Sequence, residues 1–164
     1  MKKLLALFAV LSMLGGCATY KMVPDGYTGP TVTVKDTTIR ESTGKGSIFY
    51  VESINGNEVF NALKATGRAS YGQGFRLTLV PDWRSVKVEP MKLKLIGTHV
   101  TAAPIHELAS RAAGEFFSVA GDIDFSPVAG RTYVVNGALT KQEASVWIED
   151  EDTKELVTKK IIAR

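Results

Sequence analysis

Few residues of this chain have a type and spacing suited to catalysis or metal binding. The two histidines, His99 and His106, are seven residues apart and do not match the spacing of a helical zinc site. No serine stands between the glycines of a nucleophile elbow. The stretch Gly72-Gln73-Gly74 precedes an expected strand, whereas a dinucleotide-binding glycine loop follows one. We therefore predict no catalytic residue, no metal site and no dissociable cofactor, and we expect both histidines at the surface.

Acidic residues support only a weaker hypothesis. Asp122 alternates with apolar neighbours, so we expect it on a solvated strand face. The four consecutive acids at 149–152 cannot all converge on one cation, and we interpret them as a turn between the last two strands. An enzyme would have to use a site around His106, Glu107 and Asp122. We rank this enzyme hypothesis below two binding hypotheses, in which the ligand is another envelope protein or a glycan.

A polar and aromatic stretch at 68–75 is the most distinctive candidate for a contact surface. Its glycines and its place in an expected long connection favour a loop, in which Arg68, Tyr71 and Gln73 could meet a carbohydrate, a peptide or another protein. Trp83 follows Pro81-Asp82 in an expected turn, which predicts an exposed contact residue, whereas Trp147 is expected in the core. The alternative is a loop that packs on its own side chains.

The N-terminal segment has the three parts of a secretory signal peptide. Residues 1–3 begin the chain with two lysines, residues 4–14 form an apolar stretch broken only by one serine, and Gly15 and Gly16 precede the single cysteine, Cys17. No apolar run reaches the roughly 20 residues that a membrane-spanning helix needs. We expect cleavage between Gly16 and Cys17.

The four residues Leu14-Gly15-Gly16-Cys17 resemble the bacterial lipobox. The resemblance implies that the sulfur of Cys17 carries a diacylglycerol and that its new amino group is acylated. Several acyl chains, at about 0.8 kcal/mol per buried methylene, hold a protein on a bilayer without a spanning helix. Ala18 follows, and not the aspartate that retains such proteins at the inner membrane, which implies an outer-membrane location facing the periplasm.

The charge balance excludes one class of partner. The chain has 20 basic and 17 acidic residues, and loss of Lys2 and Lys3 with the signal peptide leaves a near-neutral protein. Such a protein lacks the basic footprint of nucleic-acid binding. The expected partners are the membrane, through the anchor, and another envelope protein or a glycan.

The remaining sequence is typical of an all-β protein. Alternating or β-branched stretches are separated by turn signals about every ten residues, and Asn55-Gly56 is a hairpin signal. We predict an antiparallel β-sandwich of about seven to eight strands, with one short helix or irregular crossover at 104–117. The expected strands are 31–34, 47–54, 74–80, 85–96, 117–125, 131–138, 143–149 and 155–161.

These patterns divide the chain into three parts. Residues 1–16 are expected to be a lipoprotein signal peptide, 17–30 a lipidated tether rich in glycine and proline, and 31–164 one sandwich domain. An alternative for the tether is that part of it packs on the domain as an irregular edge, through Tyr20, Met22 and Tyr27.

Residues 125–135 and 146–153 are similar to the closing strands of many uncharacterised bacterial lipoproteins. The hairpin at 49–57, with the strand at 92–95, resembles transthyretin-like or PEGA-like sandwich modules. The resemblance implies a sandwich fold and an envelope location, and it supplies no catalytic residue. The sequence therefore favours a non-enzymatic, lipid-anchored periplasmic binding protein. The alternative is a peptidoglycan- or carbohydrate-binding module that uses Trp83 and the stretch at 68–75.

Overall fold

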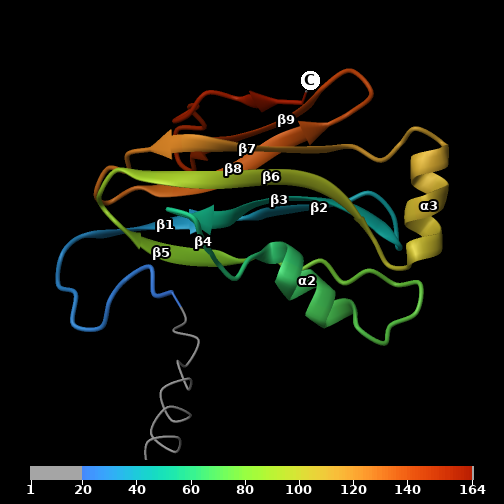
Figure 1. The fold of residues 1–164 in the computed structure, drawn as a ribbon, viewed down its shortest axis with the longest axis horizontal. Coiled ribbons are helices and arrows are strands. Elements are labelled where there is room, and N and C mark those ends of the chain that lie inside the picture. Colours follow the sequence, from blue (N-terminus) through green and yellow to red (C-terminus); the bar gives the residue numbers. More distant parts are fainter. Residues whose placement is uncertain (1–19, 164) are drawn as a thin grey trace, which may run out of the picture.

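The computed structural model describes residues 20–163, and Gly16, Cys17 and the expected signal peptide lie outside them. Ten strands and two short helices follow each other along the described chain (Figure 1). Their bounds are β1 Thr31–Lys35, β2 Thr37–Arg40, β3 Lys45–Ile54, β4 Asn57–Glu58, α2 Ala62–Ser70, β5 Trp83–Lys87, β6 Met91–Thr101, α3 Pro104–Ala112, β7 Ser118–Phe125, β8 Thr132–Leu139, β9 Ala144–Asp150 and β10 Ile161–Ile162.

The strands form two sheets, which confirms the predicted all-β sandwich architecture at this level. The first sheet has the order β10-β9-β8-β1-β5, and the second has the order β2-β3-β6-β7, with β4 paired to β3. Two details differ from the prediction: there are ten strands, and β1 runs parallel to β8, with Thr33 opposite Thr132. Strand β1 lies between β8 and β5, two strands that are distant from each other in the sequence. After β1, the chain crosses to the other sheet at Asp36.

The core lies between the two sheets. Alternate residues of each strand point inward, so that Phe49 and Val51 of β3 share this core with Leu95 of β6 and Ile148 of β9. All four side chains are at most 1% exposed. Burial of each such side chain contributes about 1.5–3 kcal/mol, and this burial is what holds the two sheets together.

The Asn-Gly pair makes the predicted hairpin. Asn55 and Gly56 have φ angles of 50° and 81°, and they connect β3 to the short β4. Asn55 also accepts a hydrogen bond from the backbone N–H of Lys92, which ties the turn to β6. A left-handed conformation at both central residues is what this turn type requires.

Residues 20–163 contain two short helices, where the sequence predicted one at most in the sandwich domain. Helix α3 begins at Pro104, so the segment for which a short helix or an irregular crossover was expected contains a helix. Helix α2 was missed: Asn61 is its N-cap, and the Asn61 side chain accepts from the N–H of Lys64 at 3.1 Å. Gly67 interrupts the helical pattern, and this masked the signal in the sequence. Within residues 20–163, no helix has the length and apolar character to cross a membrane.

The strand predicted at 74–80 is wrong, and these residues are irregular. Backbone N–H groups of this segment donate hydrogen bonds to acceptors that are not part of a β-sheet. The N–H of Leu77 donates to Thr43, while those of Thr78 and Val80 donate to hydroxyl groups of Ser70 and Thr66 on α2. The segment is therefore attached to α2 and not to a neighbouring strand.

Two other strand predictions needed correction. The stretch at 85–96 is divided into β5 and β6, which belong to different sheets and are separated by Pro90. The stretch at 155–161 is mostly irregular, with one isolated bridge between Glu149 and Leu156, and only Ile161 enters β10. The turn predicted at 149–152 is only partly right, because Glu149 and Asp150 are the last residues of β9 and only Glu151 and Asp152 belong to the turn that follows it.

A buried ion pair connects four elements. Asp36 lies between β1 and β2, and its Oδ2 is 2.5 Å from Nη2 of Arg84 on β5. The same carboxylate accepts from the N–H groups of Val51 on β3 and Ala62 at the start of α2. Both charged side chains are at most 2% exposed. Asp36 thus links the two sheets to α2 at the point where the chain crosses between them.

The segment at 20–30 lies against the domain. Tyr20 and Met22 pack on the core, and the N–H of Val88 donates to the carbonyl of Pro30. This agrees with the alternative in which part of the expected tether packs as an irregular edge. In Figure 1 the segment lies on the same side of the sandwich as β5 and α2, opposite β9.

Candidate functional site

The most developed concave site is a cleft between α2 and α3, over the outer face of β6. Its volume is about 580 Å³, within the range of small-ligand pockets. The floor is formed by the end of β6 and the residue after it, with Thr98, His99, Val100, Thr101 and Ala102 in the lining. The lining on the α2 side comes from Leu63, Thr66, Gly67, Ser70 and Tyr71, and on the α3 side from Glu107, Arg111, Phe116 and Ser118.

Helix α2 and the segment after it form one wall because hydroxyl groups hold them together. Thr66 and Ser70 bond to the backbone at 78–80, so their hydroxyls are already partnered. Tyr71, at the end of the helix, is 89% exposed. Gly72 and Gly74 have φ angles of 75° and 62°, which only glycine adopts readily, and they turn the chain sharply around the rim.

The opposite wall carries a fixed charge pair. Glu107 and Arg111 are one turn apart on α3, with Oε1 of Glu107 2.9 Å from Nε and 2.8 Å from Nη2 of Arg111. The guanidinium also lies 4.0 Å from the ring centroid of Phe116. These contacts place a cation and an aromatic ring at the rim, facing a floor of both polar and apolar side chains. The cleft can accept an apolar group with a polar or anionic end.

The structure brings only one of the predicted loop residues to the cleft, which is Tyr71. Arg68 is on α2, and its guanidinium stacks on Phe60 at 4.6 Å from the ring centroid. Gln73 is used internally: its amide donates to Ala69 at 2.6 Å, and it accepts from the hydroxyl of Thr78. Trp83 is 67% exposed at the start of β5, as predicted, and does not line the cleft.

The three residues of the enzyme hypothesis are in different places. Glu107 lines the cleft, whereas His106 lies in a separate pocket beside Phe75, with 5.1 Å between ring centroids. Asp122 is on the solvated face of β7, as its alternation predicted. Among residues 20–163, no group of three His, Cys, Asp or Glu side chains is arranged to hold a metal ion.

The prediction of a surface position for His99 was wrong, because the residue lies in β6 and is only 4% exposed. His99 lies opposite Ser47 of β3, and alternation places its side chain on the same face of β6 as the buried Leu93 and Leu95, although the residue also contributes to the cleft lining. His99 Nδ1 is 2.9 Å from Oε1 of Glu41, which also accepts from the Ser47 hydroxyl at 2.5 Å. Burial lowers the pKa of His99 despite Glu41, which favours a neutral ring that donates from Nδ1.

The electrostatics of Glu41 complete this cluster. Burial raises the pKa of Glu41, but the Ser47 hydrogen bond, His99 and Lys45 outweigh it, so the carboxyl pKa is lowered overall. The unpartnered Nε2 of His99 is buried, with the rings of Phe116 and Phe117 5.8 and 5.7 Å from the imidazole. His99 and Phe116 both contribute to the lining of the cleft, so this buried polar cluster borders it.

Trp147 also differs from its prediction. It lies on the outer face of the first sheet, because Val146 and Ile148 on either side of it point into the core. Its indole N–H donates to Glu149 at 2.9 Å, and the Lys160 ammonium lies 4.3 Å from its ring centroid.

The sequence signal for the cleft was weak, since only the Glu-Arg spacing on an expected helix at 104–117 could have marked its charged wall.

Comparison of the chain with protein-family models, with curated proteins and with solved structures gives no match. The function therefore has to be argued from the residues themselves.

Proposed function

We propose that this chain is a lipid-anchored protein of the bacterial outer membrane that faces the periplasm and binds another envelope protein without catalysing a reaction. The proposed anchor is a diacylglycerol thioether and an N-acyl group on Cys17. The lipobox-like sequence at 14–17 supports the anchor. Such a protein needs a recognition surface on its folded part.

The cleft between α2 and α3 is the observation that carries the binding role. Helix α2 packs on the outer face of the second sheet over a small apolar cluster of Ile48, Tyr50 and Ala62, and the concave surface opens between this helix and α3. Val100 and Leu63 in its lining, together with the exposed Arg111 at its rim, suit a peptide segment with an apolar side chain beside an acidic one. A segment of another envelope protein meets this description.

A glycan is the second candidate ligand, and Tyr71 favours it. This ring is 89% exposed at the cleft rim, so one face is free to stack on a sugar. Peptidoglycan is the glycan that a periplasmic surface meets. Retention of the purified protein on peptidoglycan, and its loss in Tyr71→Ala, would select this ligand over a protein.

The anchor is tested by intact-mass spectrometry of protein extracted from membranes. We expect a mass of residues 17–164 plus acyl groups, and loss of the acyl mass in Cys17→Ala. An uncut chain, or a mature chain that begins after residue 17, would contradict the anchor.

The cleft is tested by photo-crosslinking in cells that produce the full chain. A photoreactive residue at Tyr71 should capture a discrete partner, whereas one at Val128, which is 62% exposed and outside the cleft, should not. Gly67 lines the cleft and has no atom within 4 Å of an added Cβ. Gly67→Trp should therefore fill the cleft and abolish the adduct. An adduct that persists in Gly67→Trp would rule out the cleft as the binding site.

A further inference from the structure

The position of Tyr20 restricts where a lipid on Cys17 can lie. Tyr20 and Met22 pack against the core, so the chain is held to the domain from this point onward. Three residue steps join Cys17 to Tyr20, and consecutive Cα atoms are about 3.8 Å apart. The Cα atom of Cys17 therefore lies within about 11 Å of that of Tyr20, whatever path the chain takes. An anchor at Cys17 must bring the bilayer close to this part of the domain.

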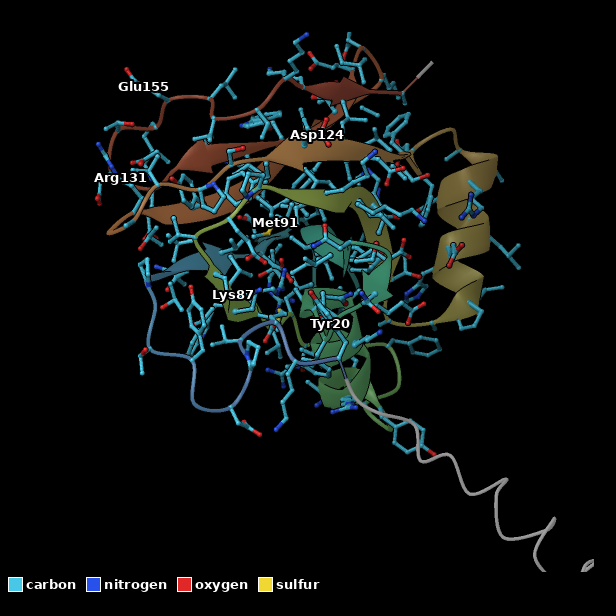
Figure 2. The ribbon with its side chains drawn as sticks, turned by 60° about the vertical axis from the view of Figure 1, so that its left-hand side comes forward. Tyr20, Lys87, Met91, Asp124, Arg131 and Glu155 are labelled. Atoms are coloured by element: carbon cyan, nitrogen blue, oxygen red, sulfur yellow. The ribbon has the colours of Figure 1, made fainter. Side chains whose placement is uncertain are left out.

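Tyr20 belongs to one side of the sandwich, which we define by β5, α2 and residues 20–30. Figure 1 shows these elements together along one side, with β9 along the opposite side. In Figure 2, Tyr20 and Lys87 of β5 lie in one half of the molecule, and Asp124 and Glu155 lie in the other. A bilayer near Tyr20 thus meets β5 and α2 first.

This side carries exposed aromatic residues. Trp83 points outward from β5, because Arg84 next to it points inward, and it is 67% exposed. Phe60, just before α2, is 41% exposed, and Tyr27 is 37% exposed. Tryptophan and tyrosine are the residues enriched where a protein meets the headgroup region of a membrane, since their rings are both apolar and polar.

The charges on this side are compatible with a phospholipid surface. The acidic groups of Asp25 and Glu58 are each paired with a lysine, Lys21 and Lys64. Arg68 extends over the ring of Phe60, so a cation and an aromatic ring are presented together. Exposed basic residues next to a bilayer are attracted to anionic headgroups.

We propose that the side formed by β5, α2 and residues 20–30 rests on the phospholipid surface, with Trp83 and Phe60 in the headgroup region. The inference depends on the lipid anchor proposed above. It fixes the orientation of the domain: the short link from Cys17 holds this side at the membrane, while β9 and β10 face away from it.

The two tryptophans of the chain provide the test. Trp147→Phe leaves Trp83 as the only indole, at the proposed membrane side. Trp83→Phe leaves Trp147, three strands away on β9, as a matched control. Each lipidated variant is extracted in detergent and reconstituted into vesicles of phosphatidylethanolamine and phosphatidylglycerol, with or without brominated acyl chains, which quench nearby indoles.

We expect loss of Trp83 emission in brominated vesicles and a shift of its maximum to shorter wavelength, with Trp147 emission unchanged. Intact mass and vesicle flotation are measured on the same samples. If an acylated, vesicle-bound protein shows no quenching of Trp83, or equal quenching of both indoles, the orientation is overturned and the anchor stands. If the protein is not acylated and does not float, the anchor itself fails, and the orientation fails with it.

Discussion

Replacing Asp36 by alanine removes the partner of a guanidinium in the protein interior. Arg84 is 2% exposed and has its closest acidic contact at the Asp36 carboxylate, 2.5 Å away. The same carboxylate accepts from the backbone N–H groups of Val51 and Ala62. Loss of this one side chain therefore leaves a buried charge and two buried donors without their acceptor.

The expected cost follows from these contacts. Removing one member of a buried ion pair typically destabilises a protein by about 3–5 kcal/mol, and each orphaned donor adds about 1–3 kcal/mol. These costs are not additive, and Asp82, 3.3 Å from Arg84, compensates part of the loss. We expect Asp36→Ala to lower the free energy of unfolding by about 4 kcal/mol, which lowers Tm by roughly 10 °C for a chain of this size.

Urea unfolding followed by tryptophan fluorescence measures this change. Asp25→Ala is the matched control, because Asp25 is also paired with a basic residue, Lys21, but is 86% exposed, and it should not change the midpoint measurably. The double variant Asp36→Ala with Arg84→Ala should cost less than the sum of the single variants, since the buried charge is then removed too. A loss below about 1 kcal/mol for Asp36→Ala would refute the assigned role of the pair.

Four further perturbations have definite expected outcomes. Burial lowers the pKa of His99 below its ordinary value of 6.5, so the unfolded chain binds more protons than the native state between that lowered pKa and about pH 6.5. The free energy of unfolding should therefore fall as pH decreases through this window, and His99→Gln should remove that dependence; a flat profile for the unmodified protein in urea titrations would contradict it. Gly137→Ala should destabilise the protein by about 1–3 kcal/mol or more, because an added Cβ would lie 2.3 Å from a Phe49 ring carbon. In contrast, Gly67→Ala on α2 should raise the free energy of unfolding by about 0.5–1 kcal/mol, since the added Cβ meets no atom within 4 Å; equal thermal shifts for the two glycine variants would argue against this packing. Asn61→Ala should cost about 1 kcal/mol through loss of the α2 N-cap, measured by thermal unfolding, and no change would mean that the cap contributes nothing.

The sequence predicted well those features that depend on neighbouring residues. The local strand patterns placed β3, β7 and β8, and Asn55-Gly56 marked its hairpin, because side-chain direction and turn type are local properties. The strand predicted at 74–80 failed, although its alternation was clear. Its N–H groups bond to hydroxyls of α2, and a donor's partner depends on the fold and not on the alternation.

The candidate site shows the same difference between features that depend on neighbouring residues and features that depend on the fold. Arg68, Tyr71 and Gln73 are close in sequence, but the α2 helix turns Arg68 toward Phe60, and the following segment engages Gln73, so that only Tyr71 reaches the cleft. The charged wall comes from α3, which begins more than thirty residues later in the chain. No local pattern indicates that these two helices flank the same strand.

The amino-acid sequence by itself determined the all-β class, the alternation that builds the sandwich and the expectation of a lipid anchor at Cys17, because these depend on composition, period and short motifs. The tertiary structure decided the rest. It placed β1 between β8 and β5, buried His99 beside Glu41, turned Trp147 out of the core, and formed the cleft between α2 and α3. Each of these depends on contacts between residues distant in the chain, which become defined only when the two sheets pack together.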